Sequence, residues 1–346
     1  MENKKNRNII ITIGIVFSVL VFVYCLIYIY NYYSMNDILW YVPNNVKDNN
    51  DKLSPNELGD SIGGILNPIV GLLASILTFL AFYIQKIAND EIKEQFKIQQ
   101  FESQFYEMLR LHKENVNEIE IKTKDKDIIK GRLVFYEMKK ELEILLTFTK
   151  EYHKKPLDDE LFFDAYEKYF WGFNSEVKIS ITPILEANLD ENSFEAELNR
   201  LKQSEETKTS FDAEILKTNL KIPFLDGHHS YLGHYYRHLF HTVKFIVSKN
   251  FLSRNQKLNY LRTLRAQLSN YEQVMLFYNW LSEYGFAWED KNNHFLTEYK
   301  MIHNLWYTEL LEDDYFKENL KKLVGVYKKL GFSDDLFEMK DKKIFE

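Results

Sequence analysis

The sequence has little of three residue types: one cysteine, six prolines and twelve glycines among 346 residues. A single cysteine excludes an internal disulfide framework and any zinc site that is built on cysteine ligands. Scarce glycine and proline argue against sandwiches, barrels and doubly wound sheets, which need many tight turns, and favour long helices joined by polar loops. The formal net charge of −7 provides no general basic field for binding nucleic acid.

Sequence motifs of common enzyme classes are also absent. The chain has no GxxxxGK[ST], GxGxxG, GxSxG or HExxH motif and no protein-kinase motif set. Its one cysteine, Cys25, lies inside an apolar run, which excludes thiol catalysis. The sequence therefore predicts no cofactor, and it leaves open whether the protein is an enzyme.

Two uncharged apolar runs lie near the N-terminus, at residues 9–30 and 62–84. Each is about 22 residues long, enough for a helix that rises about 1.5 Å per residue to cross a hydrocarbon core of ~30 Å. The first run is too long for a signal peptide, and no small-residue cleavage site follows it. In the second run, small residues are expected to let the two helices approach closely: Gly63, Gly64, Gly71, Ala74 and Ser75.

Basic residues flank the two runs unevenly. They precede the first run at Lys4, Lys5 and Arg7 and follow the second at Lys86, Lys93 and Lys97, whereas the loop at 31–61 has only Lys47 and Lys52. Because basic residues favour the cytoplasmic side of a membrane, both termini are predicted to be cytoplasmic. We therefore predict a multi-pass cell-membrane protein with an anchor at residues 1–87, an extracytoplasmic loop at 31–61 and a cytosolic domain at 88–346.

The residues after the second run have helical periodicity. Apolar residues recur at three- and four-residue steps, which predicts helices at 86–121, 133–153, 160–169, 230–249, 255–284, 293–309 and 315–330. Alternating β-branched residues leave a strand open at 177–182. The predicted fold class is all-α: a two-helix N-terminal transmembrane hairpin followed by a multi-helix cytosolic domain.

Five of the nine histidines lie within residues 228–241. On a helix, His234, His238 and His241 would share one face. Arg237 lies beside them and would repel a cation, and no HExxH motif is present, so no metal site is predicted.

Two interpretations of this histidine segment stay open. A guanidinium can hold a phosphate and an imidazole can transfer protons, so Arg237 and His241 are candidates for acid–base chemistry or RNA cleavage. Helical HEPN ribonucleases of defence systems use an Arg and a His separated by four to six residues, whereas only three residues separate Arg237 from His241 here. The alternative is amphipathic packing, in which His, Tyr and Arg side chains cover an aromatic core.

A second candidate lies in the segment that follows. Arg265, Ser269, Glu272 and Asn279 recur at near-helical spacing beside an apolar stripe. A buried Glu272 would need a cation, and Arg265 or Arg237 are the candidates. These residues form either a polar pocket shared with His238 and His241 or an interhelical ion pair that sets the packing register.

Three cytosolic segments together with the apolar N-terminus resemble the phage abortive-infection protein family typified by lactococcal AbiC. These segments read FESQFYEMLRLHKENVNEI, HYYRHLFHTVKFI and YLRTLRAQLSNYEQVMLFYNWLSEYG, in that order. The resemblance implies a bacterial membrane protein that limits phage multiplication at the cost of the infected cell. It transfers no catalytic residues to this chain.

The two functional hypotheses belong to different classes. One is a helical sensor or effector that binds a phage or host component at the membrane, and a second copy of the chain is a further candidate partner. The other is an infection-triggered ribonuclease that uses an Arg/His pair. Catalytic candidates are Arg237, His238, His241 and Glu272, and binding candidates are His234 and Arg265.

Overall fold

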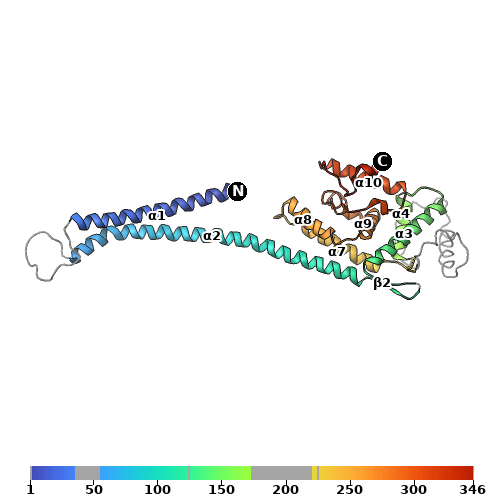
Figure 1. Ribbon diagram of the computed structural model, residues 1–346, viewed down its shortest axis with the longest axis horizontal. Coiled ribbons are helices and arrows are strands. Elements are labelled where there is room, and N and C mark those ends of the chain that lie inside the picture. The colour runs from blue at the N-terminus through green and yellow to red at the C-terminus, as the bar shows by residue number, and fades with distance from the viewer. Residues whose placement is uncertain (1, 36–54, 124, 173–219, 224–225, 346) are drawn as a thin grey trace, which may run out of the picture. The chain divides into compact units, whose positions relative to one another are not determined.

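The computed structural model describes residues 2–35, 55–123, 125–172, 220–223 and 226–345 (Figure 1). The chain divides into two compact units, unit 1 (Met1–Phe101) and unit 2 (Glu102–Glu346). The described residues are mostly helical, which confirms the prediction of an all-α chain.

Unit 1 consists of helix α1 (Glu2–Met35) and the N-terminal part of helix α2 (Pro55–Glu118). α1 lies alongside the first part of α2 (Figure 1), and the two helices approach closely at Gly14, where a Cβ atom would lie 2.8 Å from Leu80 Cδ1. Two of the small residues expected at this contact, Gly64 and Gly71, are not part of it, because a Cβ atom there would meet no described neighbour within 4 Å. The close approach therefore depends on a glycine of α1.

The predicted loop at 31–61 is helical at both ends. α1 continues to Met35 and α2 begins at Pro55, so residues 31–35 and 55–61 belong to helices. Proline suits the first position of a helix, because its fixed φ matches the helix and its missing N–H has no partner to lose there. Residues 36–54 lie outside the described residues.

Among the described residues, one helix is long and apolar enough to cross a membrane, judged by length and composition. It lies within Leu66–Glu118, and its most apolar window of 18 residues has no buried residue. A shorter apolar stretch covers Thr12–Ile27 in α1. The predicted boundary between the membrane anchor (1–87) and the cytosolic domain (88–346) falls inside α2. It marks where the chain would leave the membrane, and it stays a prediction.

Unit 2 begins with the last turns of α2 and a short hairpin. Strands β1 (Glu120–Lys122) and β2 (Ile128–Lys130) pair antiparallel, with Glu120 opposite Lys130. Helix α3 (Arg132–His153) follows and contacts both α4 (Asp159–Trp171) and α9 (Asn270–Leu281). This long, largely buried helix is therefore the central element of the unit.

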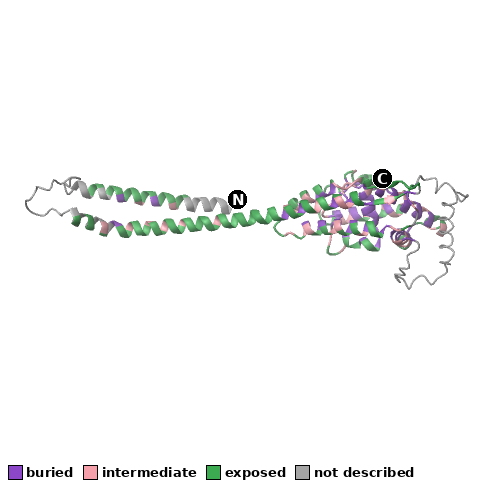
Figure 2. Ribbon diagram, turned by 90° about the horizontal axis from the view of Figure 1, so that it is seen from below, coloured by how far each residue is buried: buried purple, intermediate pink, exposed green. Residues whose placement is uncertain are grey.

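The remaining helices of unit 2 pack on one another and on the two helices that α3 contacts. Helix α7 (His229–Val247) contacts α4 and α8 (Arg254–Arg265), and η1 (Glu283–Trp288) contacts α9. The C-terminal elements are η2 (Tyr307–Glu309), α10 (Asp314–Lys329) and α11 (Lys342–Phe345). Figure 2 shows the buried residues gathered inside this unit. Its largest fully buried side chains are aromatic: Tyr166, Tyr169, Tyr235, Tyr278, Tyr327, Phe105, Phe135, Phe162, Phe277, Phe295, Phe316 and Phe337.

Two predicted helices of unit 2 need correction. The helix predicted at 255–284 is two helices, because Ser269 and Glu272 form a capping box that begins α9 after a turn. The segment at 293–309 is made of turns and one short 3-10 helix rather than an α-helix. There, the Glu289 carboxylate accepts hydrogen bonds from the backbone N–H groups of Leu296 and Thr297, at 3.0 Å each, and so replaces helical hydrogen bonds. The strand left open at 177–182 lies outside the described residues.

Candidate functional site

Helix α7 separates the predicted histidine stripe into two environments. His234, Arg237 and His241 are exposed, whereas His238 is half-buried. The buried positions of α7 are instead its apolar and tyrosine residues: Leu232, Tyr235, Tyr236, Leu239, Thr242, Val243 and Ile246. Helical periodicity therefore turns the aromatic face inward and leaves most of the predicted stripe at the surface.

His238 stacks on a histidine that the sequence did not single out. The rings of His238 and His112, from the C-terminal part of α2, have centroids 5.9 Å apart and lie 21° from parallel. The His112 ring also lies 5.4 Å from that of Tyr235. His112 is 1% exposed, and neither of its ring nitrogens has a hydrogen-bond partner among the described residues.

Both stacked histidines are shifted toward the neutral form. Burial lowers the pKa of His112 to about 4, and repulsion by His238 and Arg132 acts in the same direction. Burial also lowers the pKa of His238, with His234 and His241 adding to the shift. His112 is therefore uncharged at neutral pH.

Glu272 is completely buried at the start of α9, and its carboxylate has three described partners. It accepts hydrogen bonds from the backbone N–H of Ser269 at 2.7 Å and from the Tyr235 hydroxyl at 3.2 Å. Its cation is Arg132, whose Nε lies 3.5 Å from Oε2. The prediction that Arg265 or Arg237 supplies this charge is therefore wrong. Burial raises the pKa of Glu272, while the Ser269 hydrogen bonds and the charge of Arg132 oppose that rise.

Arg132 joins three elements at the start of α3. Besides the ion pair with Glu272, it donates a hydrogen bond from Nη2 to the carbonyl oxygen of Gln267 in the turn between α8 and α9, at 2.5 Å. Its side chain is about half exposed. This geometry is that of an interhelical ion pair that fixes α3 against the start of α9.

Arg265, the last residue of α8, contacts a different set of groups. It is 7% exposed, its Nη1 donates to the carbonyl oxygen of Lys300, and its Nε has no hydrogen-bond partner in the described part of the chain. Burial lowers its pKa to about 10, with repulsion from Arg262 as a second cause. A polar pocket shared by Arg265 and Glu272 was one of the two alternatives; Arg265 contacts Lys300, whereas Glu272 contacts Ser269, Tyr235 and Arg132.

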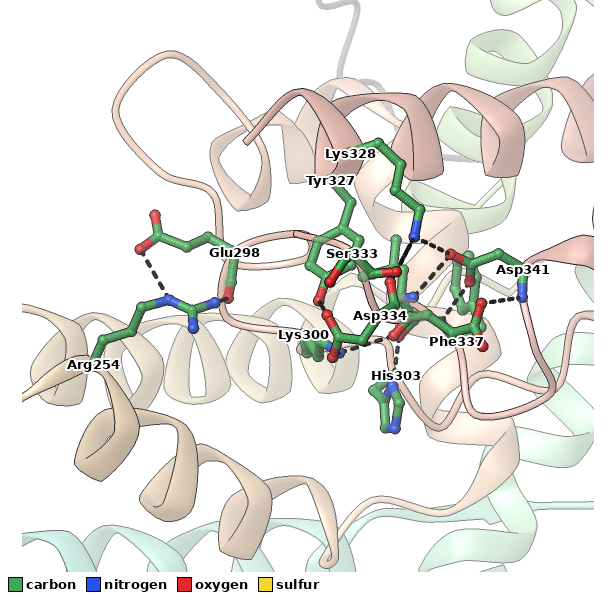
Figure 3. Close-up of polar contacts among 12 residues, drawn as sticks. Arg254, Glu298, Lys300, His303, Tyr327, Lys328, Ser333, Asp334, Phe337 and Asp341 are labelled. Atoms are coloured by element: carbon green, nitrogen blue, oxygen red, sulfur yellow. Dashed lines mark hydrogen bonds and ion pairs between the residues drawn. The ribbon is translucent and has the colours of Figure 1, made fainter. Parts of the chain in front are cut away.

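Arg265 lines a groove of about 960 Å³ between α8, the turns at 300–306 and the segment at 327–340. Figure 3 shows the polar contacts around it: Lys300 Nζ donates to Asp334 Oδ2 at 2.7 Å, and the Tyr327 hydroxyl donates to Asp334 Oδ1 at 2.5 Å. These two donors lower the pKa of Asp334 to about 2. The charges of Lys300 and Asp334 therefore neutralise one another.

The sequence analysis also did not predict a buried pair of His228 and Glu141 in the same unit. His228 Nε2 lies 2.6 Å from Glu141 Oε2, with both side chains almost fully buried. The sequence shows the group of histidines near residue 228. It does not show that His228 contacts Glu141, because the two residues are 87 positions apart. The described residues contain no group of three or more His, Cys, Asp or Glu side chains arranged to hold a metal ion.

One comparison with known proteins gives a match. No curated protein and no solved structure matches the chain. Residues 227–310, which extend from the start of α7 through η2, match the family model described as "Putative phage abortive infection protein". This segment contains the histidines of α7 and the capping box of Glu272, and it includes two of the three cytosolic segments that carry the resemblance. The match at residues 227–310 therefore supports the resemblance of this chain to the family of putative phage abortive infection proteins.

Proposed function

We propose that this protein limits phage multiplication from the cell membrane. Residues 1–87 would form a two-helix anchor with both termini in the cytoplasm, and residues 88–346 a cytosolic helical domain that acts as a sensor or effector. The family match of residues 227–310 supports the abortive-infection role.

The apolar surface of unit 1 is the observation that carries the membrane part of the proposal. Large apolar side chains of α1 and α2 are exposed along both helices, among them Ile13, Phe17, Leu20, Phe22, Val70, Leu72, Phe79 and Phe82. A contiguous apolar surface of this kind is unfavourable in water and favourable in lipid tails, since burying apolar area from water gains roughly 25 cal/mol per Å². Backbone groups in a helix are satisfied internally, so both helices suit a bilayer.

The charges around this surface support the orientation. Basic residues at 4–7 and 86–97 would lie at the same side of the membrane, and two apolar helices in sequence return the chain to that side. The domain after residue 88 would then be cytosolic, where a phage component is produced.

The exposed residues of α7 support a binding role for the cytosolic domain. His234, Arg237 and His241 lie at the surface within the family-matched segment. Exposed, potentially charged side chains on a rigid helix are available to a phage or host component, or to a second copy of the chain. The ribonuclease alternative names Arg237 and His241 and remains a prediction.

Reporter fusions test the topology. A reporter fused after Glu346 is expected to be active in the cytoplasm, and the same reporter inserted near residue 49 is expected to be inactive there. The reverse pattern would exclude an intracellular target for unit 2.

Phage plating tests the role of α7. Cells that express Arg237→Ala or His241→Ala at the normal level are expected to lose protection, whereas the control Lys329→Ala, at the end of α10, is expected to keep it. Protection by both α7 variants would exclude this surface as the functional one.

A further inference from the structure

A cavity of about 480 Å³ lies in unit 2, and the functions considered above do not use it. It is bounded by the last turns of α2, by the junction of β2 with α3 and by the turn between α8 and α9. Its lining residues are His112, Lys113, Val116, Asn117, Lys130, Gly131, Arg132 and Gln267. For brevity this cavity is called the basic pocket.

All charged residues that line the basic pocket are cations. These are Lys113, Lys130 and Arg132, and no Asp or Glu belongs to its described lining. Two of them also contact carboxylates that do not line the pocket. Lys130 Nζ lies 2.7 Å from Glu120 Oε2, and Arg132 Nε lies 3.5 Å from Glu272 Oε2. Three cations around one small cavity favour an anionic occupant.

The N-terminus of α3 lies at the same place. Gly131 is its N-cap residue, no side chain caps the helix there, and the first turn contains no acidic residue. Gly131 has φ 62, a conformation that suits glycine, and its own N–H donates to the carbonyl oxygen of Ile119 at 2.8 Å. The Val134 N–H donates to the Gly131 carbonyl oxygen at 3.0 Å, which leaves the N–H groups of Arg132 and Leu133 as the donors of the first turn. The first N–H groups of a helix attract anions.

His112 is the second, independent observation. Its imidazole is almost completely buried, lines the basic pocket and has no hydrogen-bond partner at either nitrogen among the described residues. Buried polar groups are nearly always hydrogen-bonded, so an unpartnered imidazole beside a cavity is a donor or acceptor available to an occupant of that cavity. A ring N–H of His112 can donate to an anionic oxygen, and the amides of Asn117 and Gln267 can donate as well.

We infer that the basic pocket binds a phosphoryl group, either as free phosphate or as the phosphate of a nucleotide. Its oxygens would accept hydrogen bonds from the first turn of α3, from Lys113 and from His112, while Lys130 and Arg132 balance the remaining charge. Phosphate carries several acceptor oxygens, and charge-assisted hydrogen bonds to it are the strong kind. This inference does not depend on the membrane anchor or on the residues of α7.

Binding is measured on the full-length chain in detergent micelles or nanodiscs, in phosphate-free buffer. Inorganic phosphate and ATP are titrated separately by calorimetry and by thermal unfolding, with sodium chloride at matched ionic strength as the control. A ligand that binds only the folded chain raises the unfolding temperature in proportion to its occupancy, and chloride is expected to raise it less. Tighter binding of ATP than of phosphate would identify a nucleotide site, and equal binding a free-phosphate site.

Charge-reversal variants place the binding in the pocket. Lys113→Glu and Lys130→Glu each replace an exposed cation of the lining and are expected to weaken binding by about tenfold or more, as the loss of a charge-assisted hydrogen bond implies. Lys122→Glu is the matched control, since Lys122 is exposed on β1 of the same hairpin but does not line the pocket. Equal binding by all three variants, or no binding of phosphate and ATP by the wild type, would overturn the inference.

His112→Phe tests the buried imidazole. Phenylalanine keeps a ring against Tyr235 and His238 but removes both nitrogens. A folded variant with at least several-fold weaker phosphate binding is expected. Unchanged affinity would remove His112 from the site, and if this variant does not fold, the comparison of Lys113→Glu with Lys122→Glu decides the question.

Discussion

Large apolar side chains point outward in unit 1 and inward in unit 2. Leu72 of α2 is 64% exposed and its neighbours Phe79 and Phe82 are similarly open, whereas Leu142 of α3 and Phe105 near the end of α2 are completely buried. Figure 2 shows this difference directly, with exposed residues along unit 1 and buried residues inside unit 2. Both units are helical, so helix formation alone does not decide where apolar residues lie.

The comparison shows that the described apolar side chains are covered by protein in unit 2 and largely uncovered in unit 1. In unit 2 the apolar faces of several helices cover one another, and buried charges such as Glu272 and Arg132 pair across elements. In the described part of unit 1 the two helices meet at Gly14 and Leu80, while most of the described apolar side chains are exposed. A membrane supplies the missing apolar surroundings in our proposal.

The largest expected effect comes from removing the anchor. Deletion of residues 1–87 takes away α1 and the apolar first part of α2, so the remaining chain is expected to leave the membrane fraction completely and to lose defence. Cell fractionation followed by immunoblotting measures the first effect, and phage plating the second. Membrane retention of the shortened chain would contradict the comparison, and full protection by a released fragment would favour a diffusing enzyme.

A charge placed on each unit sharpens the comparison. Leu72→Arg is expected to cost about 3 kcal/mol of membrane insertion, because a charged residue at the centre of a spanning helix is unfavourable. Leu330→Arg, at an exposed position that follows α10 in unit 2, is expected to change the free energy of unfolding by only about 0.5 kcal/mol. A membrane-insertion assay of Leu72→Arg and an unfolding assay of Leu330→Arg measure these two costs. A cost for Leu72→Arg as small as that for Leu330→Arg would mean that Leu72 faces water.

Acid is expected to destabilise unit 2 through His112. The folded-state pKa of about 4 lies below the ordinary value of 6.5, so between pH 6.5 and 4 the unfolded chain binds a proton that the folded chain does not. The contribution of His112 to the free energy of unfolding is therefore fully present above pH 6.5. It falls as the pH drops toward 4, by about 3 kcal/mol in total. Urea unfolding at several pH values measures it. In His112→Phe this part of the pH dependence should vanish, and its persistence would assign the loss to other groups.

The smallest expected effects compare two arginines of unit 2. Arg132→Ala leaves the buried Glu272 carboxylate without its cation and is expected to cost about 2 kcal/mol of unfolding free energy, moderated by the partial exposure of Arg132. Arg237→Ala changes an exposed residue and is expected to cost within about 0.5 kcal/mol. Denaturant unfolding of both variants tests this order. A larger loss in Arg237→Ala would mean that its role is structural.

The sequence predicted most helices but not their breaks. Strong apolar periodicity located α3, α7 and α10 within about two residues, since a single helix must turn its apolar face inward whatever its partner is. The break between α8 and α9 was missed although the Ser269–Glu272 capping box is visible in the sequence, because the apolar stripe continues across it. The turns at 293–306 were missed because the carboxylate of Glu289 satisfies backbone groups that a helix would otherwise satisfy.

Taken by itself, the sequence determined the all-α class, the apolar helices of unit 1 and the family resemblance, because composition, periodicity and local motifs are properties of neighbouring residues. It also singled out Glu272 as a group in need of a cation. Only the tertiary structure decided that this cation is Arg132, that His238 stacks on His112, and that Lys113, Lys130 and the start of α3 surround one cavity. Arg132 and Glu272, like His112 and His238, lie far apart along the chain, and contacts between distant residues depend on how helices pack, which no local pattern records.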